Sequence, residues 1–126
     1  MDYRNYNSIA LAFLGDAVYE RFIRERILRS GQVGADRMHR EAVRYVRAAA
    51  QEQALRAMQD GLTETEADVV RRARNHKITS KPKNADPVTY KMATAFEALL
   101  GYLYLAGETE RLEEIMRRAA EIIEEP

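Results

Sequence analysis

Two carboxylates stand inside the two most apolar stretches of the sequence. Asp16 interrupts LAFLGDAV (residues 11–18), and Glu97 interrupts AFEALL (residues 95–100). A carboxylate among apolar side chains needs a cation, hydrogen-bond donors or a proton, because burying an uncompensated charge costs several kcal/mol. We therefore expect Asp16 and Glu97 to be candidates for metal binding and catalysis, provided that the fold brings them together.

Glycines beside these acids indicate how the two stretches meet. Gly15 and Gly101 each cost about 1 kcal/mol inside a helix relative to alanine, which predicts close approach of another backbone or a substrate. If the two helices cross at these glycines, Asp16 and Glu97 meet. Oxygen ligands on rigid helices suit a hard divalent ion such as Mg²⁺. The alternative is that each acid pairs with a buried Arg or Lys.

The elements that must position these acids all read as helices. Apolar residues recur at helical spacing, and no stretch alternates for long as a strand would. Thr63 and Glu66 form a capping box, and Asp86-Pro87 marks another helix start. We predict helices over residues 8–30, 36–60, 63–76, 88–105 and 112–122, with a loop over 78–86. The predicted fold is all-α, as one domain over residues 1–126.

Composition excludes several classes of protein. The chain has 126 residues, 20 basic against 20 acidic, and no cysteine. Disulfide frameworks, thiolate zinc sites and cysteine nucleophiles are therefore excluded, and a cytoplasmic location fits. The apolar stretches are too short for a membrane span and the N-terminus lacks a signal core, so we expect no membrane association. His39 and His76 have no metal-ligand spacing.

Positive charge is concentrated in one segment of this neutral chain. Residues 71–91 hold seven basic residues and one acid, centred on the predicted loop. Such a belt could be a solvated face or could contact the phosphates of RNA. The candidate RNA-binding residues are Arg72, Arg74, Asn75, Lys77, Lys81, Lys83 and Asn84.

The same stretches carry a family resemblance. FLGDAV (13–18) is similar to the signature of ribonuclease III, and AFEALLGYLYL (95–105) resembles its second acidic motif, with matching spacing. RNHK (74–77) and KPKN (81–84) resemble the short branch, Mini-ribonuclease III. The likeness covers nearly the whole chain, and we expect the chain to lack a separate double-stranded-RNA-binding domain, as that branch does.

The resemblance implies an all-helical homodimer that hydrolyses double-stranded RNA with Mg²⁺, leaving 5′-phosphate and 3′-hydroxyl ends. For the short branch it implies maturation of the 23S ribosomal RNA precursor, and it leaves open whether a ribosomal protein presents the RNA. Asp16 and Glu97 match metal ligands of the family, and Phe13 matches the aromatic at its two-fold interface. Ala12 and Thr94 stand where longer members have two further acids.

Two rival functions remain beside this one. The first is a ribonuclease-III-like module that binds ribosomal RNA without cutting it, with the two missing acids as signs of decay. The retention of both Asp16 and Glu97 argues against it. The second is a helical protein-interaction domain, which would leave the basic loop without a purpose.

Overall fold

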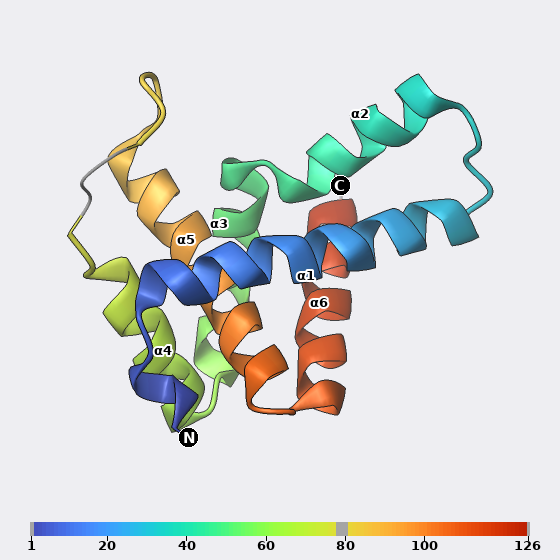
Figure 1. Ribbon diagram of the computed structural model, residues 1–126. Coiled ribbons are helices and arrows are strands. Elements are labelled where there is room, and N and C mark those ends of the chain that lie inside the picture. The colour runs from blue at the N-terminus through green and yellow to red at the C-terminus, as the bar shows by residue number, and fades with distance from the viewer. Residues whose placement is uncertain (1, 78–80, 126) are drawn as a thin grey trace.

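The fold is all-α, as predicted. The computed structural model describes residues 2–77 and 81–125, and within these residues it contains helices and connecting segments but no strand. The α-helices of this part of the chain are α1 (Ser8–Arg29), α2 (Ala35–Val46), α3 (Ala48–Met58), α4 (Glu64–Arg74), α5 (Pro87–Leu105) and α6 (Thr109–Glu124), drawn in Figure 1. Two short 3-10 helices, η1 (Tyr3–Asn5) and η2 (Gln59–Gly61), precede α1 and follow α3.

Three of the predicted helix starts are confirmed by side-chain caps, whereas the last helix begins at Thr109, before the predicted residue 112, and has no such cap. The Asn7 side chain accepts hydrogen bonds from the first N–H groups of α1. The capping box of Thr63 and Glu66 opens α4. Asp86 caps α5 by accepting from the N–H of Thr89, with Pro87 in the first turn. These side chains satisfy N–H groups that have no partner within a helix, so local sequence alone places these boundaries.

The prediction of one helix over residues 36–60 is wrong. Two helices, α2 and α3, cover this range, and they are separated at Arg47, whose backbone is extended with ψ of 150°. The N–H groups of Ala50 and Gln51 both bond to the carbonyl of Arg47, each at 3.1 Å, which starts a new helix. Figure 1 shows the change of direction. Apolar periodicity misses this bend because α2 and α3 face the same core.

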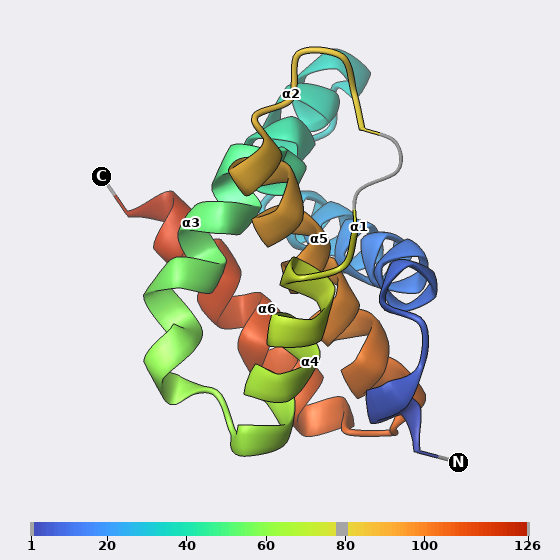
Figure 2. The ribbon, with the colours of Figure 1, turned by 90° about the vertical axis from the view of Figure 1, so that its left-hand side faces the viewer.

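Helix α5 lies at the centre of the molecule. It packs most extensively against α1 and also contacts α3, α4 and α6, an arrangement visible in Figure 2. Its fully buried side chains include Phe96, whose ring meets that of Tyr19 edge to face at 5.0 Å between centroids. A helix surrounded by others is apolar on most of its circumference, which is the composition of α5. Apolar as α5 is, no helix in the described ranges has the length and composition to cross a bilayer.

Candidate functional site

The crossing of α1 and α5 occurs at the two glycines that the sequence singled out. A Cβ atom at Gly15 would overlap the carbonyl oxygen of Glu97, and one at Gly101 would overlap the carbonyl oxygen of Leu11. The backbones of α1 and α5 therefore touch, and only glycine permits this approach. The predicted crossing is confirmed.

This contact brings Asp16 and Glu97 together. Burial, together with the adjacent Asp16 carboxyl, raises the pKa of Glu97 to about 8, and a hydrogen bond from Gln51 offsets the rise only in part. Two like charges at one place disfavour each other's ionised form. Glu97 is partly buried, but Asp16 is exposed, so the expectation that both acids lie in the core is wrong for Asp16.

No basic side chain in the described ranges forms an ion pair with either acid. Other acids in this molecule do have such partners: Arg111 pairs with Glu66, and Arg26 with Glu124. The alternative that a buried Arg or Lys neutralises Asp16 and Glu97 is therefore wrong. Two carboxylates held in contact without a protein cation are a fitting ligand set for a divalent metal ion, whose charge would remove their repulsion.

The candidate metal site contains two acids, Asp16 and Glu97. The described residues contain no group of three or more His, Cys, Asp or Glu side chains placed to hold a metal ion. Ala12, on the turn of α1 before Asp16, is buried, and Thr94 is partly buried on the turn of α5 before Glu97. Water, which Mg²⁺ commonly retains in proteins, and substrate phosphate oxygens would complete such a ligand set.

A third polar side chain of this site was missed by the sequence analysis. Gln51 on α3 is 2% exposed, and its Nε2 donates to Glu97 Oε2 at 3.4 Å and to the carbonyl of Val46 at 2.9 Å. A signal for it exists, because Gln51 occupies a position of the apolar periodicity shared with Ala54, Leu55 and Met58. A polar residue on a core face is the kind of anomaly that marked Glu97.

The candidate RNA-binding residues occupy the end of α4 and the segment before α5. Lys81 bonds the carbonyl of Ala85 at 3.1 Å, which shapes that segment. Arg72 differs from the others, because it donates to the carbonyl of Arg4 and to Asn5 Oδ1, which ties α4 to the N-terminal segment. The exposed members of the set are Arg74, Asn75, Lys77, Lys81, Lys83 and Asn84. The predicted loop is described from residue 81 onward, and residues 78–80 lie outside the described part.

Phe13 is not a core residue. Its side chain is 84% exposed on the first half of α1, and Ile9, one turn earlier, is 48% exposed. Residues four apart on a helix share a face, so the two form one apolar stripe that leads toward Asp16. Ordinary core packing is thereby excluded for Phe13 within this chain.

Comparison with known proteins agrees with this geometry. The Ribonuclease III domain family matches residues 9–108, a range that includes both acids and both crossing glycines. The chain belongs to the ribonuclease III family. It is similar to the Mini-ribonuclease 3 of Symbiobacterium thermophilum, at 54% identity over 92% of this chain and 89% of that protein. It is 47% identical to the Mini-ribonuclease 3 of Thermoanaerobacter sp., over 93% of this chain and 82% of that one.

A solved structure shares the fold of this chain. The crystal structure of a Fusobacterium nucleatum protein superposes with a TM-score of 0.84 at 31% identity, covering 95% of this chain and 96% of that one. The Mini-ribonuclease 3 relatives place this chain in the short branch. Ribonuclease III proteins are endoribonucleases that act on double-stranded RNA and generally use a divalent metal ion.

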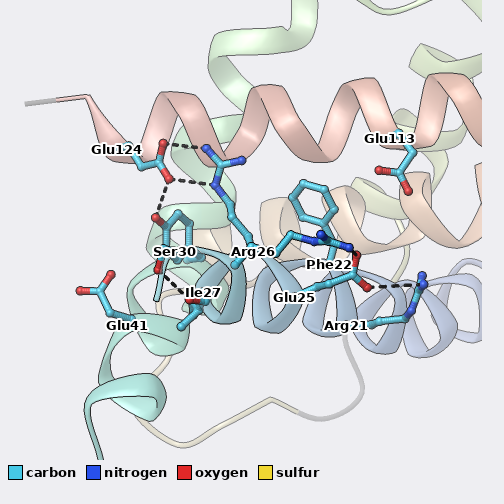
Figure 3. Close-up of a pocket in the computed structure, with 11 residues that line it drawn as sticks. Arg21, Phe22, Glu25, Arg26, Ile27, Ser30, Glu41, Glu113 and Glu124 are labelled. Carbon is cyan, nitrogen blue, oxygen red and sulfur yellow. Dashed lines mark hydrogen bonds and ion pairs between the residues drawn. The ribbon is translucent and has the colours of Figure 1, made fainter. Parts of the chain in front are cut away.

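A separate pocket lies away from Asp16 and Glu97. It occupies about 570 Å³ beside the second half of α1, between α2 and α6, and is shown in Figure 3. Arg26 there forms two hydrogen bonds of 2.9 Å with Glu124, and Tyr45 donates to the same carboxylate at 2.6 Å. These bonds join α1, α2 and α6, so this cluster has the satisfied polar groups of a structural clamp.

Proposed function

We propose that this chain is a Mg²⁺-dependent endoribonuclease specific for double-stranded RNA, and that its substrate is the 23S ribosomal RNA precursor. The observation that carries the proposal is the contact of Asp16 with Glu97 at a glycine crossing, without a protein cation in the described residues. The names of the relatives, each a Mini-ribonuclease 3, support the choice of substrate class.

The residues of the crossing have distinct tasks in this proposal. Asp16 and Glu97 would hold the metal ion, and the glycine contact would keep their helices from separating. When bound, Mg²⁺ supplies Lewis-acid polarisation of the phosphate and acidifies a water nucleophile. Attack by water with departure of the 3′ oxygen leaves a 5′-phosphate and a 3′-hydroxyl. No serine, cysteine or histidine nucleophile is required.

Affinity for RNA would come from the exposed basic residues of the α4–α5 connection. Lys81 and Lys83 precede the start of α5, and Glu97 lies ten residues further along, about 15 Å at the helical rise. That separation lets one duplex contact the loop through its phosphates and the acids through a reacting phosphodiester. Duplex RNA is recognised largely through shape and backbone, which suits such contacts.

The active form would be a two-fold homodimer joined through the apolar stripe of Phe13 and Ile9. An exposed phenylalanine beside the acids is explained if a second copy covers it. Two sites would then face the two strands of one duplex and cut them with a stagger. Light scattering at micromolar concentration is expected to give the mass of a dimer, and Phe13→Glu is expected to give a monomer. A wild-type monomer contradicts this arrangement.

The experiment that tests the function is cleavage of a long RNA duplex followed by mapping of the ends. With Mg²⁺ we expect cuts in both strands and short 3′ overhangs carrying 3′-hydroxyls opposite 5′-phosphates; with EDTA we expect none. Cyclic or 3′-phosphate ends, or cuts confined to single strands, contradict the proposal. The matched substrate is the same sequence as a single strand.

A second candidate is a module that binds ribosomal RNA without cutting it. The observation that favours it is the acid set of two, with Ala12 and Thr94 beside the acids. The same experiment separates the two candidates, because this module would retain duplex binding and give no product at any Mg²⁺ concentration.

A further inference from the structure

The buried amide of Gln51 is the starting point. Of the described side chains, only three polar or charged ones are buried, and Gln51 is one of them. Its Oε1 has no hydrogen-bond partner within the described structure, while its Nε2 has two. An unpaired buried polar atom destabilises a fold by about 1–3 kcal/mol. An apolar side chain here would avoid that loss but would leave the Val46 carbonyl without its donor, so the two effects largely cancel and the glutamine brings the core little net stability.

The orientation of the amide is determined by the backbone. A carbonyl oxygen can only accept hydrogen bonds, so the Gln51 atom 2.9 Å from the Val46 carbonyl must be the NH₂ group. The second hydrogen of that group is then available to Glu97 Oε2, 3.4 Å away. The reversed amide would set its oxygen against both acceptors, which excludes it.

The break between α2 and α3 makes this anchor available. In a continuous helix the Val46 carbonyl would accept from the N–H of Ala50, but that N–H bonds to Arg47 instead. The Gln51 side chain takes its place on Val46. One side chain therefore connects the bend of the backbone to a carboxylate of the site, although α3 itself contributes no acid to the pair.

We infer that Gln51 is a positioning residue, which holds the Glu97 carboxylate in the orientation that binds Mg²⁺ together with Asp16; this rests on the proposed function. Repulsion from Asp16 would otherwise turn the Glu97 side chain away, and a donor anchored on the main chain opposes that turn. Mg²⁺ accepts little deviation from octahedral geometry. Because this site offers two carboxylates, the orientation of each one affects Mg²⁺ binding more than it would in a site with four.

The competing interpretation is that Gln51 only caps the Val46 carbonyl. Gln51→Met has the same chain length and no donor, and Gln53→Met is the matched control because Gln53 is exposed on the same helix. Calorimetry of the full chain with Mg²⁺ alone, duplex cleavage kinetics and thermal unfolding are to be compared. For Gln51→Met we expect Mg²⁺ to bind about tenfold more weakly and kcat to fall about tenfold, with KM for the duplex unchanged. Gln53→Met is expected to match the wild type.

If Gln51→Met has the same Mg²⁺ affinity and kcat as the control, even with a lower Tm, the positioning role is overturned. Gln51 would then act only as a cap of the Val46 carbonyl. Failure of the proposed function has a different signature, namely undiminished Mg²⁺ binding in Glu97→Gln. The unsubstituted protein provides a readout that needs no folded variant. Its Gln51 side-chain amide resonance should shift on addition of Mg²⁺ while that of Gln53 stays, and an unmoved Gln51 resonance overturns the inference.

Discussion

Glu66 and Glu97 are two glutamates in one helical core with opposite surroundings. Glu66, 3% exposed, accepts two bonds of 2.8 Å from Arg111 and one of 2.9 Å from the N–H of Thr63. Burial raises its pKa, but the bonds from Arg111 and Thr63 outweigh burial, so the pKa lies below the ordinary value. Burial and Asp16 raise the pKa of Glu97 to about 8.

The difference separates structural acids from functional ones in this molecule. Glu66 has a cation supplied by its own chain, and the result is a clamp between α4 and α6. Glu97 has another acid beside it instead, so its ionised form is disfavoured until a ligand brings positive charge. Local charge balance, more than burial, therefore distinguishes the two.

The largest effect expected from this comparison is on cleavage. Glu97→Gln should reduce duplex cleavage at least about a thousandfold, because it removes a proposed metal ligand and keeps the shape. Glu66→Gln should leave cleavage per folded molecule unchanged. Initial rates at saturating Mg²⁺, with circular dichroism to confirm the fold, measure both. Near-normal turnover in Glu97→Gln would remove the distinction between the two glutamates.

The next effect concerns stability at the paired acid. Arg111→Met leaves the Glu66 carboxylate buried without its cation, and the free energy of unfolding should fall by about 3 kcal/mol. Arg118→Met, an exposed change on the same helix, serves as the control and should stay within about 0.5 kcal/mol. Urea denaturation measures the difference. Equal stabilities of the two variants would show that Glu66 does not depend on Arg111.

The pH dependence of stability should differ at the unpaired acid. The pKa of Glu97 is about 8 in the folded protein, above an unfolded value of about 4.3, so the native state binds the extra proton between these values. Its contribution to stability is present at low pH and is lost as pH rises through about 8. Wild type minus Glu97→Gln should therefore decline steadily as pH rises across this window without Mg²⁺. A flat difference curve contradicts the shift.

The smallest effect extends the comparison to the basic residues. Arg111 is paired with an acid inside the fold, whereas Lys81 and Lys83 are exposed and form no ion pair within the described residues; Lys81 bonds only the main-chain carbonyl of Ala85. Lys81→Ala with Lys83→Ala should weaken duplex binding about tenfold and reduce the salt slope by about one unit per lost contact. Arg117→Ala with Arg118→Ala, equally exposed on α6, is the control. Binding titrations at several salt concentrations measure both effects. Unchanged salt slopes would mean that Lys81 and Lys83 are solvated and do not contact the RNA phosphates.

Local sequence is enough to place the helices that carry their own caps and the point where two of them cross. Asn7, Thr63 and Asp86 act within a few residues of their own position, so their effect is readable from the neighbouring residues. The role of Gly15 and Gly101 could be predicted for a similar reason. A glycine that weakens an apolar helix indicates that another backbone approaches closely there. The meeting of Asp16 and Glu97 followed from these positions.

The rest of the site around Asp16 and Glu97 depends on contacts between segments that are distant in the sequence. The bend at Arg47 depends on a side chain that caps Val46 while packed against α5, and apolar spacing does not register such a contact. The exposure of Asp16, one residue past the crossing glycine, depends on how α1 packs against α5, and the bond of Arg72 to the N-terminal segment joins residues far apart in the chain. The local sequence shows which side chains could cap a helix, bind a metal or contact RNA. Packing between segments that are distant in the sequence determines which of these side chains come into contact.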